Sequence, residues 1–182
     1  IQDIVSGAVR KLTGETCTLI GSGRTDAGVH ALGQVANFHT SSGIPPERFS
    51  YALNSVLPKD IVIRHSEEAA SDFHARFSAR GKTYIYLIFQ AEHPSALLRN
   101  RACHVPYVLD DKAMCEAAGF FTGTHDFSAF RASGSSTETS VRTMTQAIFR
   151  EREDFYKFGR LFELRISGDG FLYNMVRIMA GT

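Results

Sequence analysis

The sequence predicts an α+β fold in which a mostly antiparallel central sheet is flanked by helices. Helical periodicity and apolar strand-like runs occur in mixed order, without the regular strand–helix–strand repeat of a parallel sheet. The longer strand segments are typical of antiparallel pairing, and no tandem repeat of solenoid length is present. The 182 residues are enough for one domain with a sizeable core, or for two small lobes.

The first half of the chain is expected to open with an amphipathic helix. Apolar residues recur at helical spacing over residues 1–13, and Gly14 is a natural stop. Pro45 and Pro46 predict the start of a second helix, because the first helical turn needs no backbone N–H from those positions. The other elements expected here are a strand, a glycine-rich loop and two more strands, at residues 16–20, 21–28, 34–40 and 61–64.

In the second half, Thr83 to Phe89 is apolar enough to predict a strand in the middle of a sheet. Asp110 or Asp111 is expected to cap a helix that runs to about Phe121. Residues rich in Gly, Ser and Thr then predict a long functional loop at 122–142. The remaining elements expected are two strands, their connection and a last helix, at residues 144–152, 161–167, 154–159 and 171–179.

The composition narrows the class of protein. Hydrophobic residues make up 43% and charged residues 21%, as in an ordinary globular protein, and no apolar run approaches the ~20 residues of a membrane span. No secretory signal segment is evident at the N-terminus. Three widely spaced cysteines form no CxxC pair, which favours a reducing, cytoplasmic compartment. The net charge of +1 neither requires nor excludes a nucleic-acid partner.

One loop carries a carboxylate in an unusual setting. Asp26 follows two glycines and Arg24 and precedes another glycine, so it is expected on a turn that projects into a cleft. The alternatives are a turn aspartate that bonds its own backbone, a surface ion pair of Arg24, and a structural role for His30. A metal site is disfavoured because no third ligand lies at suitable spacing, and the loop lacks the patterns of a phosphate cradle.

The sequence of this loop is a long, nearly contiguous motif and is therefore a specific signal. Residues 23–31 read Gly-Arg-Thr-Asp-Ala-Gly-Val-His-Ala, and Gly-Gln-Val follows at 33–35. This string resembles the signature loop of the TruA family of tRNA pseudouridine synthases. The resemblance implies that Asp26 takes the place of the family's essential catalytic aspartate.

Further segments resemble the same family in the same chain order. Residues 73–84 resemble the segment with the family's active-site tyrosine, here Tyr84, and residues 170–177 the segment with its active-site arginine, here Arg177. Residues 123–130 are similar to a family segment as well. The resemblance covers nearly the whole chain. It implies a pseudouridine synthase catalytic domain over 1–182, or two ferredoxin-like lobes at about 1–90 and 91–182.

The ends depart from the family pattern. The chain begins at Ile1 and stops at Thr182 inside a helical pattern, so we expect a fragment that lacks the family's N-terminal strand and C-terminal end.

The resemblance also implies a reaction and its partners. The family isomerises uridine to pseudouridine at tRNA positions 38–40 in the anticodon stem-loop, with an aspartate nucleophile and a flipped base. It works as a homodimer, and we expect no metal, no small-molecule cofactor and no membrane partner. The alternatives are a synthase for other RNA positions, a catalytically impaired RNA-binding relative, and a hydrolase that uses Asp26 with His30 or His125.

Roles for individual residues follow from the resemblance. Arg177 is expected to hold the carboxylate of Asp26, and Tyr84 to stack on the target uracil. Pattern alone leaves other interpretations open, because Tyr84 shares a strand face with Tyr86 and Arg177 fits a solvated helix position. The residues expected to bind substrate are Tyr84, Arg24, His30, Arg76, Phe127 and Arg131.

Overall fold

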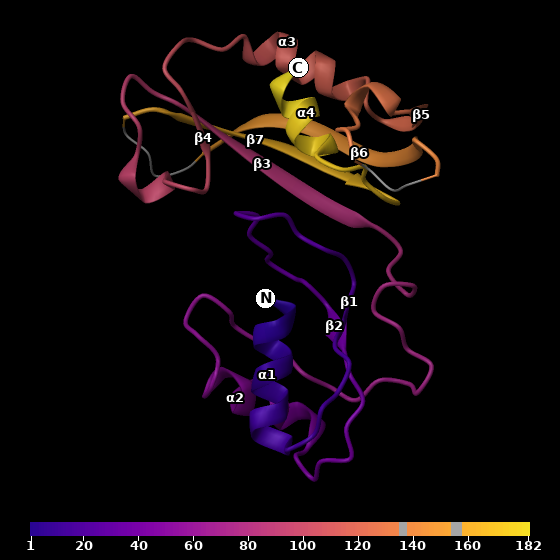
Figure 1. Cartoon of the computed structure of the whole chain (residues 1–182). Helices are drawn as coiled ribbons and strands as arrows, with labels where there is room; N and C mark the ends of the chain where they lie inside the picture. The colour runs from indigo at the N-terminus through magenta and orange to yellow at the C-terminus, as the bar shows by residue number, and fades with distance from the viewer. Residues whose placement is uncertain (135–137, 154–157) are drawn as a thin grey trace. The chain divides into compact units, whose positions relative to one another are not determined.

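The computed structural model describes residues 1–134, 138–153 and 158–182. The chain divides into two compact units, residues 1–79 and residues 80–182, and each is described by itself. Figure 1 labels the helices and strands of both units.

Helices form the core of the first unit. Helix α1 (Gln2–Thr13) ends at Gly14, whose left-handed φ of 76° lets its N–H bond back to the helix. Helix α2 (Phe49–Asn54) follows a 3-10 turn, η1 (Pro46–Arg48). The core where α1 meets α2 buries Ala8, Val9, Phe49 and Leu53. The predicted first helix is confirmed, and the second begins as a 3-10 turn rather than as a continuous α-helix.

Strands in the first unit are shorter than the sequence predicts. Strands β1 (Ile20–Gly21) and β2 (Ala36–Asn37) pair antiparallel over two residues each. The prediction of a strand at 61–64 is wrong. The side chain of Asn54 donates to the carbonyl of Ile63 and accepts from its N–H, both at 2.8 Å, so these backbone groups are satisfied without a neighbouring strand.

The second unit is built on a five-stranded sheet with the order β4-β3-β7-β6-β5. All neighbours pair antiparallel except β3 and β4, which are parallel. The mostly antiparallel α+β fold is therefore confirmed. The strands are β3 (Lys82–Gln90), β4 (Cys103–Val105), β5 (Gly123–Asp126), β6 (Val141–Arg152) and β7 (Arg160–Gly168).

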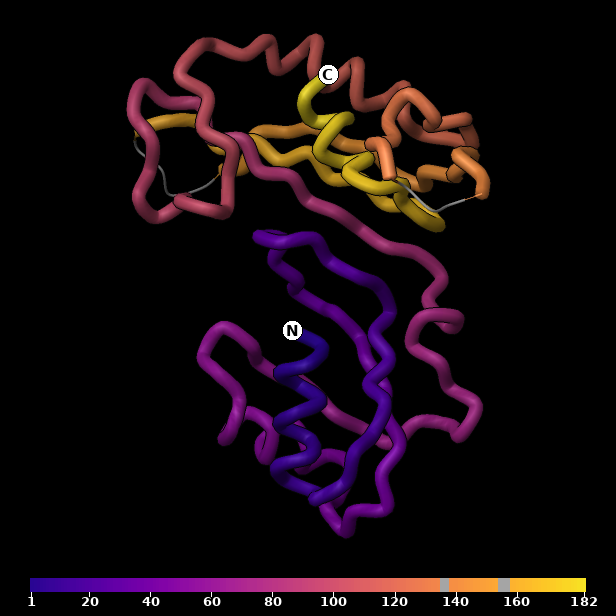
Figure 2. Tube along the Cα trace, viewed as in Figure 1, coloured from indigo at the N-terminus to yellow at the C-terminus, as the bar shows by residue number. Residues whose placement is uncertain are grey.

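Two helices pack on one face of this sheet. Helix α3 (Asp111–Gly119) contacts β6, and α4 (Met175–Gly181) contacts β3. Their buried side chains share one apolar core with the inward residues of β3, β6 and β7. In Figure 2 the course of β3 can be followed beneath the C-terminal helix. This arrangement sets α4 over the face of β3 that carries Tyr84.

The second unit also corrects several boundaries. The predicted loop at 122–142 contains β5 and a 3-10 turn, η3 (Ser128–Phe130), and strand β4 was not predicted. Helix α4 begins later than predicted, because Asn174 before it takes a left-handed φ of 57°. The predicted cap is confirmed, since Asp110 accepts the N–H of Ala113. Parts of the predicted loop and connection, 135–137 and 154–157, lie outside the described residues.

Candidate active site

Asp26 stands at the first position of a tight turn. The N–H of Val29 bonds the carbonyl of Asp26 at 3.1 Å, and Gly28 between them has a φ of 80°. A positive φ at the third position of a turn is what a type II turn requires, and glycine adopts it without strain. The side chain of Asp26 is exposed. The turn therefore presents a carboxylate outward from its unit.

The other predicted residues of the first unit are also exposed. Arg24 and His30 lie on the same loop as Asp26, so one loop presents a carboxylate, a guanidinium and an imidazole. The loop begins beside β2, where the N–H of Ser22 donates to the carbonyl of Val35 at 2.8 Å. Arg76 lies on a different segment.

The segment with Arg76 is tied to the same small sheet. The side chain of Asn37 in β2 accepts the N–H of Ala75 at 2.9 Å, and Ala75 is only 2% exposed. Arg76 itself is exposed. A buried small residue thus anchors the chain immediately before an exposed cation.

In the second unit, Tyr84 lies on β3 beneath α4. It is half-buried, and its ring meets the ring of Phe171 edge-on, with centroids 4.8 Å apart and planes at 71°. Edge-to-face pairs are a preferred geometry, because the positive ring edge meets the negative ring face. Phe171 therefore fixes the orientation of the Tyr84 ring. Arg177, on α4, is exposed.

Tyr86 joins Tyr84 and Arg177 on this face. Burial raises the pKa of its phenol, the Cys103 thiol raises it further, and the charge of Arg177 lowers it. Helix α4, which carries Arg177, contacts β3, which carries Tyr86. The structure thus brings Tyr84, Tyr86, Phe171 and Arg177 to one place between β3 and α4. The sequence offered a signal for Tyr86, its period-two spacing from Tyr84, but none for Cys103.

Two of the residues predicted to bind substrate lie in the segment after β5, and only one of them is exposed. Phe127 is only 2% exposed and packs in the core, so its ring is not open to a base, which differs from the expectation that it contacts RNA. Arg131 is exposed, and the next residue, Ala132, donates its N–H to the carbonyl of Tyr173 at 3.1 Å. Arg131 is therefore held near the start of α4.

Within the described residues, the side chains form no group of three or more His, Cys, Asp or Glu that could hold a metal ion. No helix among those residues is both long and apolar enough to cross a membrane.

Comparison with known proteins gives the family. The family model described as tRNA pseudouridine synthase matches residues 1–78 and 117–182. A protein named tRNA pseudouridine synthase A from Acetivibrio thermocellus is 59% identical over the whole chain, which spans 72% of that protein. Proteins of the same name from Ruminiclostridium cellulolyticum and Thermoanaerobacter sp. are 50% and 47% identical over the same shares.

These findings define first a class, an isomerase with the pseudouridine synthase fold. Within that class, the chain belongs to the TruA family of tRNA pseudouridine synthases.

Proposed function

We propose that this chain converts uridine to pseudouridine at tRNA positions 38–40, in the anticodon stem-loop. One observation carries the proposal. Asp26 is exposed on a sharp turn inside the string that resembles the TruA signature loop. The chain that contains it is 59% identical over its full length to a protein named tRNA pseudouridine synthase A.

The reaction is an isomerisation, so the chemistry must balance within one nucleoside. The bond from the ribose C1′ to N1 of uracil breaks, and a bond from C1′ to C5 forms. C5 loses a proton and N1 gains one, with no oxidation or reduction. A carboxylate suits this step because it can attack covalently and later leave. We assign Asp26 this nucleophilic role.

Tyr84 and Arg177 take the supporting roles. The ring of Tyr84, paired edge-to-face with Phe171, is assigned to stack on the target uracil, and stacking of this kind is worth about 1–3 kcal/mol per base. The planar guanidinium of Arg177 can hold a carboxylate through two parallel bonds, and we assign it to Asp26.

The target base must leave its stack before it can react. Extrusion from a stem costs a few kcal/mol, so the enzyme needs groups that hold the opened RNA. Arg24 shares the exposed loop with Asp26, and we assign it to the vacated space or to a neighbouring phosphate. His30, Arg76 and Arg131 are exposed candidates for further contacts. As the family resemblance implies, we propose that the enzyme works as a homodimer.

The test is conversion of uridine in an unmodified tRNA transcript, mapped position by position. We expect pseudouridine within positions 38–40. Asp60→Asn replaces an exposed carboxylate that lies outside the loop of Asp26. It is the matched control for Asp26→Asn and should retain activity. Conversion confined to positions elsewhere in the tRNA would overturn the assignment to the anticodon arm. Tight tRNA binding without any conversion would instead favour an RNA-binding relative.

A further inference from the structure

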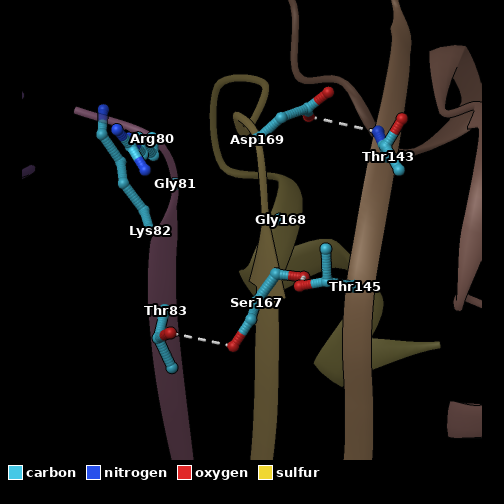
Figure 3. Close-up of a pocket in the computed structure, with 9 residues that line it drawn as sticks. All are labelled: Arg80, Gly81, Lys82, Thr83, Thr143, Thr145, Ser167, Gly168 and Asp169. Atoms are coloured by element: carbon cyan, nitrogen blue, oxygen red, sulfur yellow. Dashed lines mark hydrogen bonds between the residues drawn. The ribbon is translucent and has the colours of Figure 1, made fainter. Parts of the chain in front are cut away.

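A hollow of about 200 Å³ lies at the end of the second unit's sheet where β3 begins and β7 ends. Figure 3 shows it spanning three adjacent strands, β3, β7 and β6. None of the residues to which we have assigned a catalytic role lines it. Its lining consists of Arg80, Gly81, Lys82, Thr83, Thr143, Thr145, Ser167, Gly168 and Asp169.

Two cations at this hollow are available to a ligand. Arg80 and Lys82 are exposed, and within the described part of the chain no hydrogen bond or ion pair engages either side chain. Other arginines of the same sheet are engaged. Arg150 pairs with Glu163 at 2.8 Å, and Arg160 pairs with Asp111 at 2.6 Å. The charge on Arg80 and Lys82 is therefore not neutralised by a neighbouring carboxylate.

Hydroxyl groups complete the polar lining. Thr83 and Ser167 are direct cross-strand partners, and their hydroxyl oxygens lie 2.8 Å apart. Whichever of the two accepts in this bond keeps its own O–H for another acceptor. Thr145 donates to the carbonyl of Ser167 at 3.2 Å, which brings a third hydroxyl to the same place. Figure 3 shows these three side chains across the strands.

Backbone packing keeps the hollow open at its end. A Cβ atom at Gly81 would lie 3.0 Å from the carbonyl oxygen of Gly168, and a Cβ atom at Gly168 would meet Thr143 and Met144 of β6, so neither position leaves room for a larger side chain. The floor is therefore backbone and short hydroxyl side chains. Such a floor suits a compact polar group rather than a flat apolar ring.

The one carboxylate at the rim is committed to the fold. Asp169 accepts the N–H of Thr143 at 3.1 Å and donates its own N–H to the carbonyl of that residue. It continues the pairing of β6 and β7 beyond the end of β7. With two cations against one carboxylate, the hollow keeps a net positive charge, and its free donors favour an oxyanion.

We propose that this hollow is a phosphate subsite that holds a backbone phosphodiester of the tRNA. The proposal rests on the proposed function, which supplies the RNA. The hollow is open and its cations are exposed, which suits a group that stays attached to a polymer. Contacts of this kind position the nucleic acid and carry no sequence information. The subsite lies at the start of β3, next to Tyr84 in sequence, but Thr83 and Ser167 point to the opposite face of the sheet from Tyr84, so the subsite would hold the RNA at the end of the sheet and not over that ring.

The experiment compares two double variants that remove the same charge. Arg80→Gln with Lys82→Gln removes the subsite cations. Arg10→Gln with Lys11→Gln removes two adjacent exposed cations from α1 and is the matched control. Binding of a labelled, unmodified tRNA transcript is measured by fluorescence anisotropy from about 50 to about 300 mM KCl. The readout is the slope of log Kd against log salt.

Each lost phosphate contact lowers this slope by about 0.7–0.9. For one or two contacts, the subsite variant should lower the slope by about 0.7–1.8, and its affinity at 0.1 M salt should fall about 5- to 60-fold. The control variant should leave both the salt slope and the affinity near the parent values, apart from the small change that follows from lowering the net charge by two. Equal slopes for the two double variants would overturn the proposal.

Two further variants and a titration with inorganic phosphate test whether the charge of the hollow and the RNA backbone account for the result. The charge-conserving variant Arg80→Lys with Lys82→Arg should keep the parent slope, whereas Ser167→Asp should lower it by adding a negative charge to the hollow. If inorganic phosphate alone shifts the amide resonances of Thr83 and Ser167 while the tRNA slope is unaffected by every variant, the hollow binds a free anion and the proposal fails. Absence of conversion by the parent would defeat the proposed function, but the binding slopes would still decide on the subsite.

Discussion

The contact between Phe171 and Tyr84 gives a prediction that links packing to catalysis. The two rings meet edge-on at 4.8 Å, and Phe171 also packs against the core of the second unit. Phe171→Leu keeps an apolar side chain but removes the aromatic partner of Tyr84. An edge-to-face pair is worth about 0.5–1.5 kcal/mol beyond the area it buries. If all of that energy serves to orient Tyr84 for the reaction, kcat/KM should fall by about 2- to 13-fold.

A matched control separates orientation from stability. Phe121 forms a similar edge-on pair with Phe130, at 5.3 Å and 89°, and packs against the same core. Phe121→Leu should lower the thermal midpoint by about as much as Phe171→Leu but should leave kcat/KM for pseudouridine formation near the parent value. Equal losses of kcat/KM in both variants would show that the effect is general destabilisation.

A double-mutant cycle sharpens the test. Tyr84→Leu combined with Phe171→Leu should show a coupling of about 0.5–1.5 kcal/mol in kcat/KM, because the second substitution finds no ring left to orient. Strictly additive losses would refute the argument that Phe171 acts through Tyr84.

The remaining predictions concern stability. Phe162 is fully buried and stacks on Phe149 at 5.3 Å, so Phe162→Ala should cost about 3–5 kcal/mol, which lowers Tm by about 6–20 °C. Phe158→Ala, at a 90% exposed ring, should change Tm little. The hydrogen bond from Arg160 lowers the pKa of Asp111 in the folded protein. The ionised carboxylate therefore contributes its full stabilisation above the unfolded pKa of about 3.9. This contribution is lost as the pH falls through the lower folded pKa. The Tm difference between the parent and Asp111→Asn should therefore be constant near pH 6 and shrink towards pH 3; a difference independent of pH would contradict this.

The sequence predicted best the elements that local patterns determine. The apolar run at 83–89 became β3, which has a neighbour on each side, and the side chain of Asp110 caps α3 as expected. The period of the first helix and its glycine stop were equally local. In each case the decisive residues lie within a few positions of one another.

Elements that depend on distant partners were predicted less well. Strand β4 has only three residues and forms by parallel pairing with β3, so no local periodicity marks it. Strand β5 is an edge strand of polar residues, Gly123–Asp126, which resembles a loop in composition. The apolar residues at 61–64 suggested a strand, but the Asn54 side chain takes the backbone groups of Ile63 instead.

The candidate site shows the same division. The turn at Asp26 was predicted because glycine spacing is a local property, and the face shared by Tyr84 and Tyr86 follows from the two-residue strand period. The burial of Phe127 was not predictable, because a Phe among polar residues reads as exposed until the core that receives it is known. The effects of Cys103 and Arg177 on the pKa of Tyr86 depend on β4 and α4, which meet β3 from other parts of the chain.

The central claim is that the carboxylate of Asp26 performs the reaction, and one measurement tests it most directly. Single-turnover formation of pseudouridine is compared between the parent and Asp26→Asn, with tRNA affinity measured in parallel. Asparagine keeps the shape but cannot act as the nucleophile, so we predict no detectable conversion together with tRNA binding close to that of the parent. Conversion by Asp26→Asn at a rate comparable to the parent would contradict the account.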